Sequence, residues 1–226
     1  MNYSKLIKSL ELIKETLSSS KSRVLFNVDV PATKAEIEET ERELGKKLPR
    51  SLKEFFLTVS KDINFFIDLD ETLLKELEKN KELASTGLFE LNLSLEGVID
   101  AEDNRENWIN TCFSNLEDDY DKVWHNKLGL MSVGNGDVIA FDLLSDKEEP
   151  NVVYLSHDDA KEHGWVLGLS FESYITNYVG IACSGLESWG TEPFITDHKV
   201  GIDMTCDNAI ILRKILGLPE EYFSKN

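Results

Sequence analysis

The chain has 226 residues, and its 42 acidic side chains against 24 basic ones give a formal net charge of −18. This charge repels nucleic acid and anionic membranes and favours association with a basic partner. A hydrophobic fraction of 41% excludes a disordered chain, and no apolar run approaches the roughly 20 residues that span a bilayer. Residues 1–8 lack a signal-peptide core, and three widely spaced cysteines suit reduced thiols. We therefore expect one large cytoplasmic domain, or one domain with added segments, without membrane segments.

The first predicted elements are helices with clear boundaries. Apolar residues recur at helical spacing in 3–17, and a short apolar piece follows at 24–28. Thr33 and Glu36 have the spacing of a capping box, in which each side chain bonds the backbone amide of the other residue. Gly45 can adopt the left-handed conformation that ends a helix. These signals predict an acidic surface helix over about 34–44.

The middle of the chain mixes helix and strand patterns. Pro49 pre-sets the first turn of a helix with a broad apolar face. Helical spacing predicts helices over 50–59, 70–82 and 96–113, and residues that suit a pleated surface predict strands at 64–69 and 89–95.

The later part of the chain begins with a hairpin. Asn135-Gly136 tolerates the positive backbone angles of a tight turn between strands 128–133 and 137–144. The remaining predictions are a loop at 145–150, strands at 151–155 and 165–169, a helix over 170–181 capped by Ser170, a loop-like segment over 184–205 and a last helix over 208–216.

Antiparallel strands next to separate helices indicate an α+β fold, with a central, mostly antiparallel sheet covered by helices. We expect an N-terminal helix and lead-in over 1–30, the main domain over 31–183, and a C-terminal extension over 184–226 packed on the same domain.

Several short motifs occur in a characteristic order. They are Leu44-Gly45, Leu48-Pro49, Gly134-Asn135-Gly136-Asp137, Asp142, His157-Asp158 and Ser170-Phe171. In this order and spacing the chain resembles the SUKH superfamily, the Smi/Knr-like domains, over roughly residues 31–180. The region 58–127 is longer and more acidic than that pattern, and the segment after 184 lies beyond it. The resemblance implies a mostly non-enzymatic protein, since many bacterial members are immunity proteins that bind and silence a toxin.

The strongest candidate for a partner contact is an acidic run. Between Glu96 and Asp121, acidic side chains are opposed by Arg105 alone. Like charges at this density are solvated or are met by a cationic surface. Within this stretch and just beyond it, the predicted partner-binding residues are Glu117, Asp118, Asp119, Asp121 and Trp124. Trp124 is interpreted as an exposed anchor beside charge, whereas Trp108 and Trp165 lie in periodic segments and are predicted to be core.

Catalytic and metal-binding interpretations are weaker. His157, Asp158, Asp159 and His163 could approach one another, but nothing in their spacing resembles a metal-ligand pair on one helix. A turn with Asp158 as cap and His157 bonded to a sheet edge is favoured. Cys183 is interpreted as a small buried hydrophobe rather than a nucleophile. We predict no catalytic residues, no metal and no cofactor.

Three functions remain open at this point. The first is an immunity protein that neutralises a toxin with a basic surface, possibly a nuclease, by steric and electrostatic blockade. The second is an intracellular regulatory or scaffold module. The third is a hydrolase that uses His157 or Cys183. Salt-sensitive binding to one basic partner distinguishes the first, and loss of turnover on changing either residue to Ala distinguishes the third.

Overall fold

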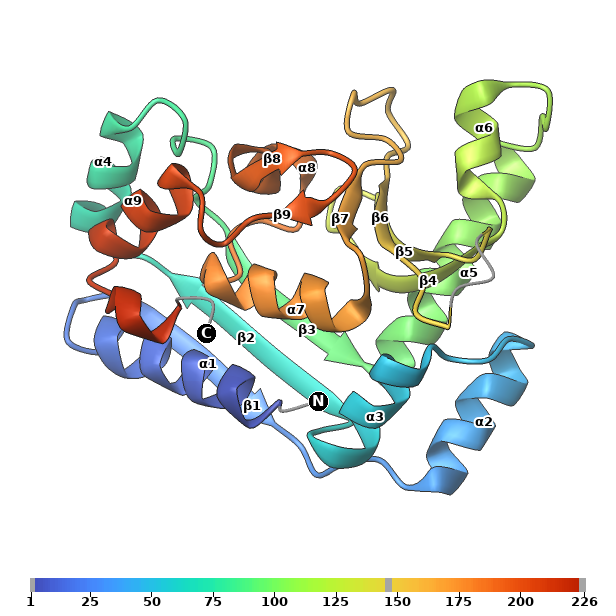
Figure 1. Ribbon diagram of the computed structural model, residues 1–226, viewed down its shortest axis with the longest axis horizontal. Coiled ribbons are helices and arrows are strands. Elements are labelled where there is room, and N and C mark those ends of the chain that lie inside the picture. The colour runs from blue at the N-terminus through green and yellow to red at the C-terminus, as the bar shows by residue number, and fades with distance from the viewer. Residues whose placement is uncertain (1–2, 145–147, 224–226) are drawn as a thin grey trace.

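The computed structural model describes residues 3–144 and 148–223. Residues 145–147 of the expected loop, and both ends of the chain, lie outside this description. Helices gather on one side of a three-stranded sheet, and a second sheet stands at one end of it (Figure 1). The predicted α+β class is confirmed.

Helices and strands are interspersed along the chain. The helices are α1 (Ser4–Leu17), α2 (Lys34–Leu44), α3 (Arg50–Thr58), α4 (Glu71–Lys79), α5 (Leu95–Thr111), α6 (Asp119–Trp124), α7 (Phe171–Gly180), α8 (Ser188–Thr191) and α9 (Asp207–Ile215), with 3-10 turns η1 (Glu192–Phe194) and η2 (Glu220–Tyr222). The strands are β1 (Arg23–Val28), β2 (Asp62–Asp68), β3 (Phe89–Ser94), β4 (Lys127–Ser132), β5 (Val138–Asp142), β6 (Val152–Leu155), β7 (Val166–Gly168), β8 (Ile195–Asp197) and β9 (Gly201–Ile202).

The strands form separate antiparallel sheets instead of one central sheet. Their orders are β1-β2-β3, β4-β5-β6-β7 and the small pair β8-β9. The first two sheets are separated along the chain because α5 follows β3 directly and then packs along β4. The long acidic region between the predicted strands therefore forms the junction between two sheets.

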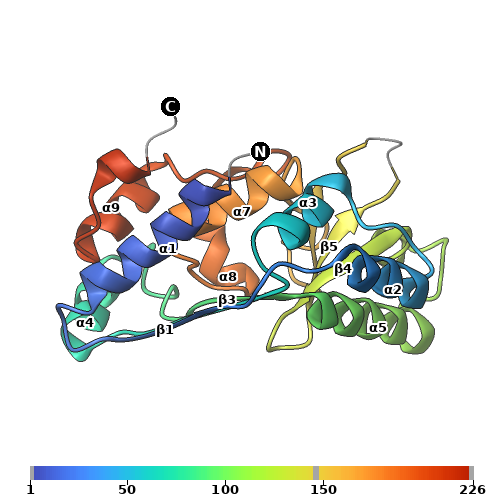
Figure 2. The same ribbon diagram turned by 90° about the horizontal axis from the view of Figure 1, so that it is seen from below.

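The three-stranded sheet has one buried and one open face. Ile63, Phe65 and Ile67 of β2 are buried, whereas the residues between them are half-buried or exposed, which is the alternation of a half-buried strand. The buried face lies under α1 and α7. Among the residues that the structure describes, no element covers the opposite face of β1 and β3 over most of their length (Figure 2).

The four-stranded sheet carries the predicted hairpin and meander. β4 and β5 pair through a turn in which Gly136 has a φ of 102°, and β6 extends the sheet antiparallel to β5. Gly129 of β4 lies directly under α5, where an added Cβ would meet the backbone N of Glu102 at 2.4 Å. Glycine at this position lets the helix and the strand approach closely.

The predicted signals around α2 are also found. Thr33 and Glu36 form the capping box, and Gly45 ends the helix in the left-handed conformation with a φ of 61°. Pro49 stands at the N-cap position, immediately before α3.

Trp108 and Trp165, predicted to be core, are each half-buried. Within the described residues, no helix is long and apolar enough to span a membrane.

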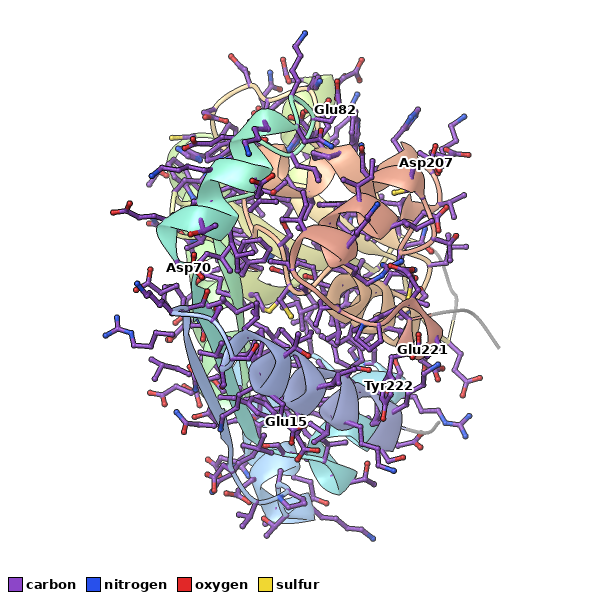
Figure 3. All side chains as sticks on the ribbon, turned by 90° about the vertical axis from the view of Figure 1, so that its left-hand side faces the viewer. Glu15, Asp70, Glu82, Asp207, Glu221 and Tyr222 are labelled. Carbon is purple, nitrogen blue, oxygen red and sulfur yellow. The ribbon has the colours of Figure 1, made fainter. Side chains whose placement is uncertain are left out.

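The segment after α7 contributes to the main core. Backbone bonds join Cys183 to Glu90 and Gly185 to Leu88 along the edge of β3. Buried side chains of α9 and of the C-terminal turn belong to the same hydrophobic cluster as those of α1 and α3. From the side shown in Figure 3, α9 lies beside α4, and η2 with Tyr222 lies against α1. The stretch predicted to be loop-like, 184–205, contains the short elements α8, η1, β8 and β9.

Candidate partner-binding surface

The predicted acidic run folds into a turn followed by α6, which the sequence patterns did not identify as a helix. The Asp118 carboxylate caps α6 by accepting bonds from the amides of Tyr120, at 2.8 Å, and Asp121, at 3.2 Å. Asp121 in turn accepts a bond from the Asn115 amide at 2.9 Å. Two of the four predicted carboxylates therefore hold the turn together.

The other two carboxylates project into solvent. Glu117 is exposed, and the side chain of Asp119 is fully exposed and pairs with Lys122 at 3.1 Å. Leu116, just before them, is 55% exposed. We call Leu116, Glu117 and Asp119 the α6 tip. It combines an apolar side chain with negative charge at the end of the molecule that carries α6 (Figure 1).

The prediction that Trp124 is exposed is wrong. Its side chain is 0% exposed and stacks on Phe113, with ring centroids 4.9 Å apart. Its carbonyl oxygen accepts a bond from the buried Arg105. Trp124 lies on the inner side of α6, where it fills a second, smaller core between α5 and the four-stranded sheet. The exposed apolar residue of this region is Leu116.

A histidine holds α6 against the sheet. The ring of His163 stacks on Tyr120 with centroids 3.8 Å apart. Its Nδ1 accepts a bond from the Ser156 amide, and its Nε2–H donates to the Tyr120 carbonyl, both at 3.0 Å. These bonds require the neutral ring, and burial lowers the pKa of His163 in agreement with this. The α6 tip is therefore supported rigidly from the end of β6.

The Gly-Asn-Gly-Asp and His-Asp motifs meet at one buried carboxylate. Asp137 accepts bonds from the Tyr154 hydroxyl, from Asn135 at 2.8 Å, and from both the amide and the Nδ1 of His157, at 2.8 and 2.7 Å. Burial opposes its charge, but the bonds from Tyr154 and His157 outweigh burial and lower its pKa.

Ligand-type atoms of Asp137, His157 and Asp158 lie within 4.8 Å of one another. Each oxygen of Asp137 already accepts two hydrogen bonds, and Asp158 accepts a bond at 2.6 Å from the Ser156 hydroxyl. This is the geometry of a hydrogen-bonded turn, as the sequence favoured, although His157 bonds the Asp137 carboxylate instead of a sheet edge and Asp158 bonds the Ser156 hydroxyl.

A second acidic surface, which the sequence analysis missed as a unit, lies between α2 and the start of α5. These helices lie side by side (Figure 2), and a groove of about 430 Å³ runs along them. We call it the acidic groove, and its carboxylates belong to Asp29, Glu36, Glu39, Glu43, Asp62 and Glu96. Lys61 is the cation that lines it, and it pairs with Glu36 at 3.0 Å. Within the described residues, neither Glu43 nor Glu96 forms an ion pair.

The corner between α2 and α3 is locked by buried Glu41, which fixes one wall of the groove. Its carboxylate accepts bonds from the Leu48 amide at 3.0 Å and from Lys47 at 2.6 Å, and it pairs with Lys53 at 3.1 Å. Burial favours the neutral acid, but these bonds together lower the pKa of Glu41.

Glu102 ties this corner to α5. It is bonded by Lys46, by Arg105 at 2.8 Å and by the Gly129 amide at 2.8 Å. Burial alone would raise its pKa, but the bonds from Arg105, Lys46 and Gly129 outweigh burial and lower the pKa to about 2. The buried charges therefore position α2 against α5, and the outer carboxylates of both helices face solvent.

Both surfaces carry carboxylates that can attract cations. The spacing of Glu36, Glu39 and Glu43 places them on one helix face, so the sequence indicated half of the carboxylates that line the groove. The other half comes from a loop, a strand and a helix distant in sequence, which periodicity does not bring together.

The chain was compared with known proteins. No curated protein matches it. A family model, that of the SMI1 / KNR4 family (SUKH-1), matches residues 31–177, which is more than half of the chain. The matched range contains α2, the Leu48-Pro49 junction, the turn at Asp137 and the start of α7. The resemblance stated from the motifs is confirmed, and this chain belongs to the SMI1 / KNR4 family (SUKH-1).

Proposed function

We propose that the protein is an immunity protein that binds a cognate toxin in the cytoplasm and neutralises it by steric and electrostatic blockade. The observation that carries the proposal is the pair of acidic surfaces, the α6 tip and the acidic groove, on a domain of this family. The toxin would present a basic surface, as many nucleases do, because a net charge of −18 favours a cationic partner.

Charge would act mainly on the rate of association. Electrostatic steering raises association rate constants to about 10⁸–10⁹ M⁻¹s⁻¹ at low salt. Blockade of the toxin by binding would then require no chemical reaction of either protein. Against the hydrolase alternative, burial raises the pKa of the Cys183 thiol, which disfavours the nucleophilic thiolate.

The test is co-expression of the full chain with the product of the adjacent gene, followed by growth and isolation of the complex. One variant alters the α6 tip (Leu116→Ala with Glu117→Gln and Asp119→Asn). A second alters the acidic groove (Glu39→Gln, Glu43→Gln and Glu96→Gln). Asp118 and Asp121 are left intact because they hold the turn. The control, Glu11→Gln with Glu15→Gln, removes exposed charges from α1.

We expect the unaltered chain to restore growth and form a complex, and at least one surface variant to weaken both. The α1 control should behave like the unaltered chain. Rescue that neither surface variant weakens would overturn the assignment of these surfaces. Absence of toxicity, complex and rescue would overturn the immunity function and favour the regulatory or scaffold module.

A further inference from the structure

Trp189 is the exposed tryptophan of the chain. Its side chain is 48% exposed, whereas Trp124 is buried and the other two are half-buried. Its neighbours in α8, Ser188 and Thr191, are 4% and 3% exposed. An exposed indole on an otherwise buried turn is a typical composition of an interaction hot spot. The residue also lies outside the range 31–177 that the family model matches.

The backbone that carries Trp189 is rigid. Gly185 has a φ of 60°, and a Cβ placed there would lie 2.6 Å from the Cα of Gly190, so the two ends of the turn touch. The Ser188 amide donates to the Tyr154 hydroxyl at 3.1 Å, and the Ser85 hydroxyl donates to the Trp189 carbonyl at 3.0 Å. Presenting the indole to a partner would therefore order little additional backbone, which limits the entropic penalty of binding.

The surroundings of this indole are acidic. Glu187 precedes it by two residues and forms no ion pair among the residues described. Its charge acts on Glu90, whose pKa is raised by burial and by Glu187. Glu192 follows at i+3, a spacing that places side chains on one face of a helix, and its side chain is 40% exposed. A cation from a partner would relieve the repulsion between Glu187 and Glu90.

The Trp189 turn is linked to α6 through the loop after β6. The Tyr120 hydroxyl of α6 donates to the Ser156 carbonyl, and Lys161 of the same loop pairs with Glu192. Figure 1 shows α6, the loop after β6 and α8 along one edge of the molecule.

We propose that Trp189 is an anchor for an arginine of the basic partner, with the guanidinium stacked on the indole and its charge met by Glu187 and by Glu192, whose carboxylate it would share with Lys161. This deepens the proposed function, on which it rests, by naming a contact and its chemistry. Arginine suits the site because its planar cation stacks on aromatic faces while its N–H groups bond carboxylates.

The contact is tested first with octa-arginine and octa-lysine peptides as probes, using the full chain. The indole N–H signal of Trp189 in a ¹H–¹⁵N spectrum is identified by its absence in Trp189→Phe. We expect octa-arginine to shift this signal more than octa-lysine does. Glu187→Gln with Glu192→Gln should weaken the effect about three- to tenfold, and Glu11→Gln with Glu15→Gln should not. Equal response to both peptides, or no response at Trp189, would overturn the arginine contact.

The second measurement uses the toxin complex. Trp189→Ala should weaken toxin binding about tenfold or more, whereas Val200→Ala, an equally exposed residue on the β8–β9 turn, should leave it unchanged. Val200→Ala should unfold near the temperature of the unaltered chain, and Trp189→Ala should unfold at a lower temperature but still cooperatively, because its indole is only 48% exposed and Ala removes its buried part. Normal binding by Trp189→Ala alongside intact rescue overturns this inference and leaves the immunity function standing. Failed rescue by the unaltered chain overturns the function, while the peptide spectra still decide the arginine contact.

Discussion

Glu102 shows how a single buried charge organises this fold. The residue is 4% exposed, and its carboxylate connects Lys46 after α2, Arg105 on α5 and the Gly129 amide on β4. A buried charge is tolerated only when partners satisfy it, and removing one partner leaves the others buried and unpaired. This residue therefore determines both local geometry and the response of the protein to acid.

We predict that Glu102→Gln lowers the free energy of unfolding at pH 7 by about 3 kcal/mol, because Arg105 loses its buried anion. In the unaltered protein the pKa of Glu102 is lowered from 4.5 to about 2. Its contribution is therefore complete above pH 4.5 and is lost as the pH falls towards 2. Urea unfolding at neutral pH and at about pH 3 should show a smaller loss of stability on acidification for Glu102→Gln. Glu11→Gln is the control, and an identical pH dependence in Glu102→Gln would contradict the prediction.

The elements are held by local caps and by one close crossing. The capping box at Thr33 and the cap at Asp118 determine where α2 and α6 begin. At the crossing of α5 over β4, Gly129 allows the backbones to touch. The acidic face of α5 is thereby fixed relative to α2, which forms the other wall of the acidic groove.

We predict that Gly129→Ala destabilises the protein by about 3 kcal/mol, at the upper end for overpacking. The added methyl would meet backbone atoms of Ala101 and Glu102, which cannot move as a side-chain end can. Gly134→Ala is the matched control, since no atom lies within 4 Å of its added Cβ, and it should change stability by less than about 0.5 kcal/mol. Thermal unfolding of both variants is the measurement. Equal stability of the two would show that α5 and β4 can separate without penalty.

At the scale of the whole molecule, one core connects the beginning and the end of the chain. Leu10 of α1, Phe55 of α3 and Leu212 of α9 belong to the same buried cluster. Arg213, beside Leu212, is also buried, and it donates to the carbonyls of Gly180 and Met204 at 2.8 Å. The segment after 184 therefore covers apolar surface that α1 and α7 would otherwise expose.

We predict that a chain ending at residue 183 loses cooperative unfolding, because Phe194, Leu212 and Phe223 are removed from the core. Near-ultraviolet circular dichroism during heating, compared with the full chain, is the measurement. A truncated chain that unfolds as sharply and at the same temperature would show that the extension is dispensable to the domain.

The net charge of −18 makes salt act in opposite directions on stability and on binding. Raising NaCl from about 50 to about 500 mM screens repulsion between exposed carboxylates, so we expect the unfolding temperature to rise. The same change should weaken the toxin complex, because steering and surface ion pairs are screened. Thermal unfolding and titration of the complex at both concentrations test this, with sucrose as the uncharged control. A complex insensitive to salt would contradict electrostatic blockade.

The sequence determined features that depend on a few neighbouring residues. The capping box at Thr33 and the stop at Gly45 are found as predicted. The hairpin also forms between the predicted strands, with a positive φ at Gly136 but not at Asn135. Local hydrogen bonds and backbone preferences decide these features, and they act over about four residues. The ordered motifs also placed the chain in its family, and the α+β class followed from the mixture of helical and strand periodicity.

Only the tertiary structure decided which charges and aromatic rings meet. The acidic neighbours of Trp124 in the sequence led to the prediction that it is exposed. It is buried because the side of α6 that carries it packs on α5 and the four-stranded sheet. The acidic groove exists because a loop, α2, β2 and α5 converge. Trp189 is exposed although its neighbours in α8, Ser188 and Thr191, are buried. Exposure and proximity depend on packing between distant segments, and composition and periodicity carry no information about such packing.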